Sequence, residues 1–123
     1  MDEAQVPELP GKDLRWRVAG HPDDVWFWKS GGESIRNIGT MLSIIGTSFT
    51  DYPRALEFGC GCGRMLLHLK DVGAKVELYG VDIDAETVQR ARETFRDRGN
   101  LRFDEGSVAA LPLPDASVDL VVS

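Results

Sequence analysis

Three glycines that alternate with other residues, placed between an apolar segment and a leucine-rich one, constrain the fold more than any other feature of the sequence. Residues 55–58 predict a short buried strand, and residues 65–69 predict the first turns of a helix. One side of the turn carries no Cβ at Gly59, Gly61 and Gly63, so the backbone can adopt positive φ and a ligand can lie against the peptide planes. A strand that leads through such a turn into a helix is the ligand-binding corner of an open α/β sheet.

The spacing of the glycines indicates which ligand this corner can hold. A nicotinamide or flavin dinucleotide requires the pattern G-x-G-x-x-G, whose third glycine would fall at position 64 or 66. Those positions hold Arg64 and Leu66, so the dinucleotide fingerprint fails on its own spacing. The pattern that is present, acidic-x-Gly-x-Gly-x-Gly with Glu57 as the acidic residue, leaves room for a ligand without a pyrophosphate.

A second carboxylate is expected beside the glycine turn. A second strand is predicted by Val76, Leu78 and Val81, and it stops at Asp82. At the end of a neighbouring parallel strand, a carboxylate can accept hydrogen bonds from both hydroxyls of a ribose. The alternative role for Asp82 is that of a helix-entry or solvent-facing acid, but Asp84 already provides the N-cap of the next helix.

The order of the elements predicts the fold class. The helix after the glycine turn is expected to end at Gly73, and the next helix runs from the Asp84 cap to Gly99. A third strand is predicted at 101–103 and, after a proline-containing loop, a fourth at 118–123. This order is typical of an α/β fold with a parallel sheet of about four strands, right-handed crossovers and helices on both faces.

The first 54 residues are expected to form two parts, residues 1–20 as an irregular arm and residues 21–54 as a helical segment, before a core formed by residues 55–123. Within the helical segment, one helix starts at residues 22–24, and the glycines after Ser30 predict a break. A second helix follows and stops at Gly46; its apolar stripe at helical spacing comprises Ile35, Ile38, Met41, Leu42 and Ile45.

Aromatic and sulfur-containing side chains allow both a structural and a functional interpretation. The run Trp26, Phe27 and Trp28 is expected to cover the core, with the alternative that one ring closes over a bound ligand. The chain has two cysteines, Cys60 and Cys62, which are too few for a structural zinc site, and a disulfide between them would strain the turn. They are therefore expected to be buried, inert thiols, and no metal site is expected.

Two further polar residues follow the third glycine. His68 stands among leucines and is expected to pack in the helix, with a role as a base as the alternative. Arg64 is either a surface cation or a group that reaches an anion on a substrate, and the sequence does not decide between these roles.

Charge and composition make several functional classes less favourable. The net charge of −6 over 123 residues disfavours nucleic acid as a partner. The charged N-terminal residues are unlike a secretory signal, and no apolar run approaches the roughly 20 residues of a membrane span. A cytoplasmic location is therefore expected.

Three stretches together resemble the motifs of class I S-adenosylmethionine-dependent methyltransferases. Motif I of that family resembles residues 56–64 (LEFGCGCGR), and its segment with the ribose-binding acid resembles residues 79–84 (YGVDID). The stretch through the family's fourth strand resembles residues 106–123, and residues 26–32 are more weakly similar to the N-terminal helix region of a bacterial subgroup. The resemblance implies a three-layer, Rossmann-like fold with S-adenosylmethionine as cofactor and S-adenosylhomocysteine as product.

The resemblance also implies roles for individual residues. Glu57 and the backbone of the glycine turn would hold the methionine part of the cofactor, Asp82 would bind the ribose, and Ile83 would lie against the adenine. Ser107 stands where many relatives carry an acidic residue, and its hydroxyl accepts a hydrogen bond more weakly than a carboxylate does. The implied cofactor-binding residues are Glu57, Gly59, Cys60, Gly61, Gly63, Asp82, Ile83, Ser107 and Val108.

The function implied by the resemblance is methyl transfer to an acceptor, expected to be a small molecule, and no catalytic base stands out. The alternative is a non-catalytic module that binds the cofactor or a related nucleoside. Relatives continue past the fourth strand with a helix and three more strands, so the chain looks like a truncated, cofactor-binding portion of the fold. The open edge of its last strand is then expected to favour self-association.

Overall fold

Four parallel strands in the order β3-β2-β1-β4 form the centre of this computed structural model, which describes residues 11, 24–69, 76–97, 99–107 and 109–123. The strands are β1 (Arg54–Phe58), β2 (Glu77–Asp82), β3 (Leu101–Glu105) and β4 (Leu120–Val122). The described helices are α2 (Asp24–Ile44), α3 (Ala85–Thr94) and the short 3₁₀ helices η2 (Phe49–Asp51) and η3 (Leu66–Leu69).

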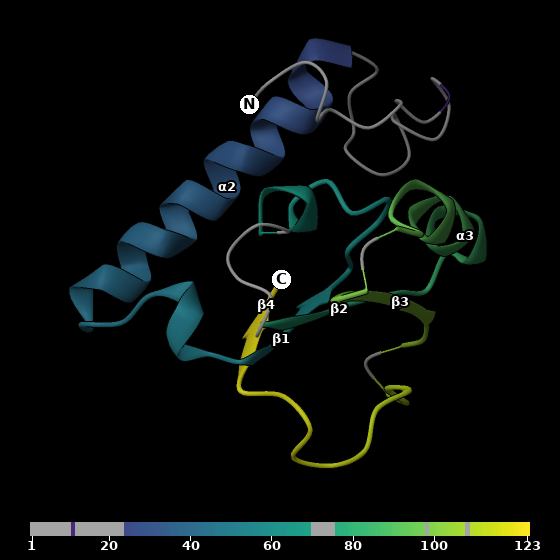
Figure 1. The fold of residues 1–123 in the computed structure, drawn as a ribbon. Coiled ribbons are helices and arrows are strands. Elements are labelled where there is room, and N and C mark those ends of the chain that lie inside the picture. Colours follow the sequence, from purple (N-terminus) through teal and green to yellow (C-terminus); the bar gives the residue numbers. More distant parts are fainter. Residues whose placement is uncertain (1–10, 12–23, 70–75, 98, 108) are drawn as a thin grey trace.

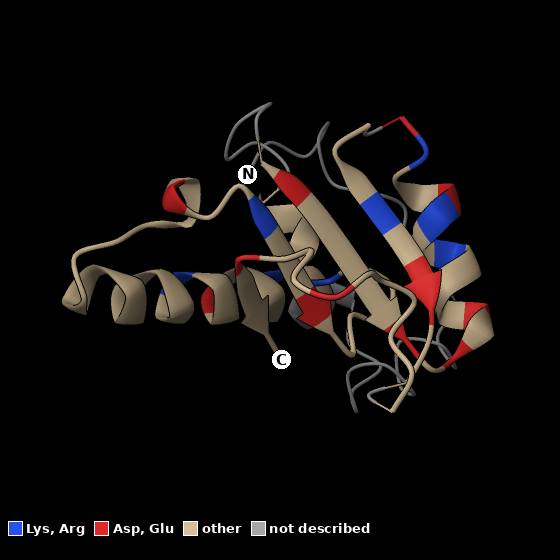
Figure 2. Ribbon diagram, turned by 90° about the horizontal axis from the view of Figure 1, so that it is seen from below, with Lys and Arg blue, Asp and Glu red and all other residues tan. Residues whose placement is uncertain are grey.

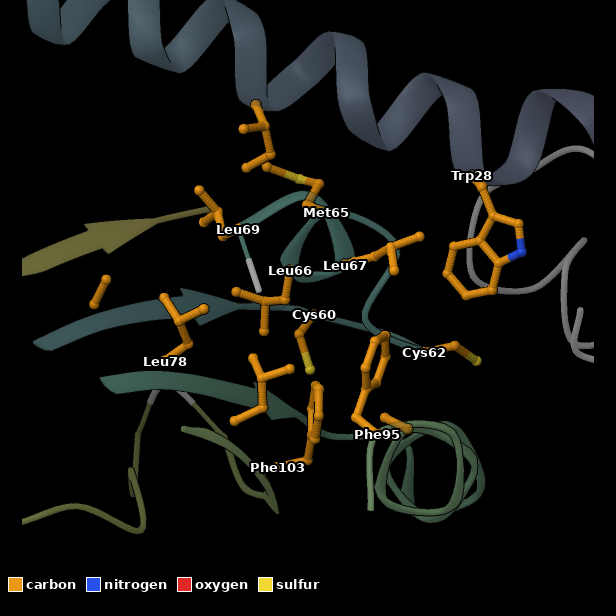
Figure 3. Packing of buried hydrophobic residues seen from close by; sticks show 14 of the residues in the cluster. Trp28, Cys60, Cys62, Met65, Leu66, Leu67, Leu69, Leu78, Phe95 and Phe103 are labelled. Atoms are coloured by element: carbon orange, nitrogen blue, oxygen red, sulfur yellow. The ribbon is translucent and has the colours of Figure 1, made fainter. Parts of the chain in front are cut away.

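The helices α2, η3 and α3 lie on one face of the sheet, and the segment 106–119 lies on the other (Figure 1). The hydrophobic core fills the space between the sheet and these helices. Figure 3 shows Leu66 of η3, Leu78 of β2 and Phe103 of β3 pointing toward one another there, with Phe95 beside them. Because side chains alternate along a strand, Leu56 points to the opposite face, where it lines a cavity.

The strand order confirms the predicted Rossmann-like α/β fold with a parallel sheet. Strand β1 pairs in parallel with β2 on one side and with β4 on the other, so that Leu56 lies between Tyr79 and Val121. The chain proceeds from β1 to β2 and β3 in one direction and then returns to place β4 on the other side of β1. The glycine turn at the end of β1 is therefore at the topological switch point, where open α/β sheets bind ligands.

The predicted break after Ser30 is wrong, because α2 is continuous from Asp24 to Ile44. The hydroxyl of Ser30 donates to the carbonyl oxygen of Phe27, and that of Ser34 to the carbonyl of Ser30, so both serines bond within the helix. The two glycines between them serve a close contact with the segment after the glycine turn, which is described below.

The predicted stop of α2 at Gly46 is confirmed. Gly46 has a φ of 80°, and its N–H donates to the carbonyl oxygen of Ser43. The N–H of Thr47 donates to the carbonyl oxygen of Leu42. These bonds form a Schellman motif. The predicted apolar stripe is only partly buried, because Ile35 and Leu42 face the core whereas Met41 and Ile45 are exposed.

Two helices differ from their predicted extents. The helix expected after the glycine turn is represented by η3, in which His68 N–H donates to the carbonyl of Met65, three residues back. Gly73, its predicted end, is outside the described residues. Helix α3 ends at Thr94 and not near Gly99. Its C-cap Phe95 still donates its N–H to the carbonyl of Ala91, but its φ of −109° and ψ of 20° depart from helical values, and its ring stacks on Phe103 with centroids 5.5 Å apart.

The N-terminal predictions are only partly covered by the structure. Residues 1–20 are outside the described part apart from Gly11, so the irregular arm stays a prediction, as does the division of the chain at residues 20 and 54. The described rings of Phe27 and Trp28 are buried in the core, as expected. Among the residues that the structure describes, no helix is both long and apolar enough for a membrane span.

Candidate functional site

The candidate site lies where β1, β2 and β3 end. The N–H groups of Gly59 and Cys60 donate to the carbonyl of Val81 at 2.7 and 3.2 Å, which ties the glycine turn to the end of β2. The N–H of Gly106 donates to the carbonyl of Asp82 at 3.0 Å, which ties the end of β3 to the same point. The sheet therefore brings three implied site residues to one edge, namely Glu57, Asp82 and Ser107.

This edge of the sheet is acidic. Asp82 ends β2, Asp104 and Glu105 end β3, and Asp84 and Glu86 stand at the start of α3. Figure 2 shows the red ends of β2 and β3 and the red start of α3 at the same side of the molecule. Arg92 and Arg102 pair with Asp104, and the other carboxylates of this edge favour a ligand that carries positive charge.

The three glycines of the turn have different surroundings. All have positive φ: 75° at Gly59, 54° at Gly61 and 84° at Gly63. A Cβ built on Gly59 would meet no atom within 4 Å, so Gly59 faces open space. A Cβ on Gly63 would lie 2.6 Å from a ring atom of Phe95, so Gly63 lets the turn pack closely on the core. A ligand can approach the turn at Gly59, whereas Gly63 has a packing role.

Asp82 holds the turn in place with both of its carboxylate oxygens. The N–H of Gly61 donates to Oδ2 and the N–H of Asp84 donates to Oδ1, each at 2.9 Å. Asp84 in turn caps α3, accepting from the N–H groups of Glu86 and Thr87 as predicted. Asp82 is thus not simply a helix-entry acid. A carboxylate has about four acceptor positions, so Asp82 keeps capacity for further donors.

Glu57 is a buried carboxyl group with an unused acceptor. Its side chain is 4% exposed, and its Oε1 atom has no hydrogen-bond partner in the described part of the chain. Burial raises the pKa of Glu57 to about 8; the positive charge of Arg64 lowers it and the negative charge of Asp82 raises it. A buried acid with a perturbed pKa beside an open turn is typical of a functional site.

Arg64 connects the turn to helix α2. Its Nη1 donates to the hydroxyl of Ser30 at 2.6 Å, and its side chain is half-buried. Burial lowers the pKa of Arg64, and the nearby Glu57 raises it. His68 also contacts α2, through a hydrogen bond of 2.7 Å between Nε2 and the carbonyl oxygen of Trp28. This contact supports the packing role predicted for His68.

The other implied residues occupy varied positions. Ile83 follows Asp82 with 73% of its surface exposed, and Ser107 is partly buried and pairs with Ala110 in an isolated antiparallel bridge. Cys60 and Cys62 are buried and form no disulfide, and burial raises the pKa of the Cys60 thiol, which supports the inert role predicted for Cys60. Val108 is outside the described residues. The described residues contain no cluster that could hold a metal ion.

Two features of the structure were not expected from the sequence. One is the contact of α2 with Arg64, which the Ser-Gly-Gly composition of residues 30–32 obscured because it indicated a break. The other is an apolar cavity of about 750 Å³ on the opposite face of the sheet. It lies beneath the segment 111–118 and is lined by Leu56, Phe58 and Val121, among others. Its lining contains none of Glu57, Asp82 and Ser107.

Comparison with known proteins agrees with this geometry. A family model described as "Methyltransferase domain" matches residues 55–123. A probable S-adenosylmethionine-dependent methyltransferase of Mycolicibacterium smegmatis is 44% identical over 68 residues, which cover 55% of this chain and 24% of that protein. The chain spans less than a third of the length of the curated relatives that it matches.

Solved structures share the fold. A SAM-dependent methyltransferase from Aquifex aeolicus superposes with a TM-score of 0.64 and 22% identity, over 93% of this chain and 56% of that one. The plantazolicin methyltransferase BpumL, solved with a substrate analogue and SAH, gives a TM-score of 0.66 at 15% identity, over 89% of this chain and 46% of that one. At these identities the likeness concerns the fold alone.

We predict that Asp82→Ala destabilises the protein. The substitution leaves two backbone N–H groups without their acceptor, and each charge-assisted hydrogen bond is worth about 1.5–3 kcal/mol. The free energy of unfolding, measured by urea denaturation, should fall by roughly 2–4 kcal/mol. Asp115→Ala, in an exposed loop position, is the control and should leave the denaturation midpoint unchanged. An unchanged midpoint for Asp82→Ala would show that this carboxylate does not hold the turn.

A second prediction concerns pH. The pKa of Glu57 is raised from 4.5 to about 8 on folding, so the stability that its proton provides is lost as pH rises through this window. Each pKa unit between the unfolded and the folded state changes the free energy of unfolding by at most about 1.4 kcal/mol. Glu57→Gln should therefore melt at least about 4 °C above the wild type at pH 8, and this advantage should shrink toward pH 5.

The matched control for the pH experiment is Glu105→Gln, because Glu105 is exposed. Its melting temperature should follow that of the wild type across the whole range. If Glu57→Gln also follows the wild type between pH 5 and pH 8, Glu57 is not protonated in the folded state.

Proposed function

Because this chain belongs to the methyltransferase domain family, among the class I S-adenosylmethionine-dependent methyltransferases, we propose that it binds S-adenosylmethionine at the acidic edge of its sheet. The observation that carries the proposal is the pairing of an open glycine turn with a buried, unpartnered acceptor. Gly59 faces open space, and Glu57 offers an Oε1 atom that has no partner among the described residues. The groups of the described residues thus leave one acceptor that a ligand can satisfy.

The cofactor's charge suits these residues. Glu57 would accept hydrogen bonds from the amino group of the methionine part, and the turn at Gly59 and Gly61 would allow the ligand to approach the backbone. The remaining acceptor capacity of Asp82 would bind the ribose hydroxyls, and the exposed apolar side chain of Ile83 would cover the adenine. When bound, S-adenosylmethionine supplies an electrophilic methyl group on a sulfonium, and S-adenosylhomocysteine is the product.

Further members of the implied site have smaller roles in this proposal. Ser107 would offer its hydroxyl to the adenine, and Val108 follows it outside the described part of the chain. Cys60 would contribute its backbone only, because its side chain is buried in the core. Gly63 would act by letting the turn pack against Phe95.

The proposed activity is methyl transfer to a small-molecule acceptor. In-line transfer depends above all on the alignment of donor and acceptor, and a base is needed only when the acceptor must lose a proton. The net charge of −6 supports a small molecule over a nucleic acid. A cytoplasmic location is part of the proposal.

We also infer that β4 associates with a second copy of the chain. In the described sheet β4 pairs with β1 on one side only, so the peptide groups that β4 directs away from β1 have no strand partner there. β4 is an edge strand of the described sheet, and Val121 is 58% exposed. Such an edge is a template for pairing with another chain.

Calorimetric titration with S-adenosylmethionine and S-adenosylhomocysteine tests the proposed function. We expect the wild type to bind both, with dissociation constants of roughly micromolar to millimolar size. Gly61→Val should weaken binding at least about tenfold, because a branched side chain is strained at the positive φ of this residue and obstructs the turn. Gly99→Val is the matched control, since a Cβ there meets open space at an ordinary φ.

The outcomes separate the candidate functions. No heat of binding by the wild type, or equal affinity for Gly61→Val, would contradict the proposed cofactor site. Incubation with cell extract and a labelled methyl donor then distinguishes transfer from binding alone. Label in a small-molecule product supports the proposed reaction, whereas binding without any transfer supports a non-catalytic binding module.

Light scattering tests the proposed self-association. The wild-type chain should form dimers or larger species at micromolar concentration. Val121→Lys should reduce their mass toward that of the monomer, because an edge-strand lysine opposes pairing. Thr50→Lys, an exposed substitution outside β4, should leave the assembly unchanged. A stable wild-type monomer at this concentration would refute the inferred association.

A further inference from the structure

One turn of helix α2 lies directly on the backbone that follows the glycine turn. A Cβ built on Gly31 would collide with the carbonyl oxygen of Arg64 and would lie 2.7 Å from its carbonyl carbon. Gly31 is itself buried. Because a backbone carbonyl cannot move aside as a flexible side chain can, this contact fixes the separation between α2 and Arg64.

Polar contacts from the same helical turn surround Gly31. The hydroxyl of Ser30 accepts from Nη1 of Arg64 at 2.6 Å, and the carbonyl oxygen of Trp28 bonds with Nε2 of His68 at 2.7 Å. A Cβ on Gly32 would lie 2.9 Å from Cε1 of the same histidine. Residues 28–32 therefore contact Arg64 and His68 through both steric fit and hydrogen bonds.

Arg64 connects this contact to the candidate cofactor site. It follows Gly63 directly, and the N–H of Leu67 donates to the carbonyl of Gly63 at 2.9 Å, so a shift of Arg64 would move the end of the glycine turn. The charge of Arg64 also acts on Glu57, the buried acid with the unpartnered oxygen. The position of α2 thus affects both the backbone and the electrostatics of the site.

From these contacts we infer that Ser30 and Gly31 are positioning residues for cofactor binding. They act through Arg64, which they hold where the glycine turn and Glu57 have their ligand-binding arrangement. The inference rests on the proposed function. The competing explanation is that the same contacts only add stability to the fold, and in that case their loss would lower the melting temperature without changing affinity.

Ser30→Ala is the first test, with Ser34→Ala as its matched control. Ser30→Ala removes a hydroxyl that holds the Arg64 guanidinium, whereas the Ser34 hydroxyl donates to the carbonyl of Ser30 within its own helix. We expect the affinity for S-adenosylhomocysteine, measured by calorimetry well below the melting temperature, to fall about tenfold in Ser30→Ala, because Arg64 is no longer held beside the glycine turn and such coupling between sites typically changes affinity about 5- to 150-fold. The affinity of Ser34→Ala should remain that of the wild type.

Gly31→Ala provides a second test with Gly39→Ala as its control. Both substitutions replace a glycine in the interior of α2, where alanine is the better helix former. A Cβ on Gly39 would lie an ordinary 3.6 Å from the ring of Phe49, so Gly39→Ala should raise the melting temperature and leave affinity unchanged. Gly31→Ala should lose more affinity than Ser30→Ala, because the helix must move away from Arg64.

The affinities decide between the two explanations. If Ser30→Ala and Gly31→Ala melt earlier but bind S-adenosylhomocysteine as tightly as the wild type, the contacts are only structural and the inference is wrong, while the proposed function stands. If Gly31→Ala does not fold, Ser30→Ala decides alone. A wild type that binds no S-adenosylhomocysteine overturns the proposed function and this inference with it.

Discussion

The carboxylate of Asp82 holds together the part of the chain that gives this fold its ligand-binding corner. Gly61 sits at positive φ, and its N–H needs an acceptor that no helix or strand provides. Asp82 supplies that acceptor from the neighbouring strand, and its other oxygen accepts from Asp84 at the entry to α3. One side chain thus joins the ends of β1 and β2 and the start of α3. The open surface at Gly59 depends on that junction.

On the side of the turn that faces helix α2, the site also combines a buried carboxyl group with a positive charge close to it. Glu57 is buried beside Arg64, and the arginine is in turn held by Ser30 of α2. Burial of a carboxyl group without a full set of hydrogen bonds costs stability, and such costs are concentrated at functional sites. The part of the chain that the structure describes therefore leaves one acceptor of Glu57 unsatisfied near the turn, where a cationic ligand could satisfy it. Helix α2 determines how close the positive charge of Arg64 lies to the carboxyl group of Glu57.

Much of the fold could be predicted because local signals and tertiary structure agree. The glycine turn, the Asp84 cap, the stop at Gly46 and the burial of the cysteines are fixed by short-range chemistry, and the structure confirms them. The predicted break after Ser30 failed because those glycines serve a contact with Arg64, distant in sequence, and not a local turn. The end of α3 was also misplaced: the C-cap Phe95 leaves helical φ and ψ values, and the sequence carries its stop signal at Gly99, beyond that point. Of the candidate site, the sequence predicted that Glu57 and Asp82 lie at neighbouring strand ends, and it did not predict the hydrogen bond between Arg64 and Ser30.

The central claim is that S-adenosylmethionine or its product binds at the acidic edge formed by the glycine turn and Asp82. Amide NMR spectra of the labelled chain, recorded during titration with S-adenosylhomocysteine, test this most directly because they locate binding residue by residue. We expect the largest shifts at Gly59, Gly61 and Ile83, with little change around the apolar cavity below residues 111–118. Shifts confined to that cavity, or no shifts at the glycine turn at saturating ligand, would contradict the account.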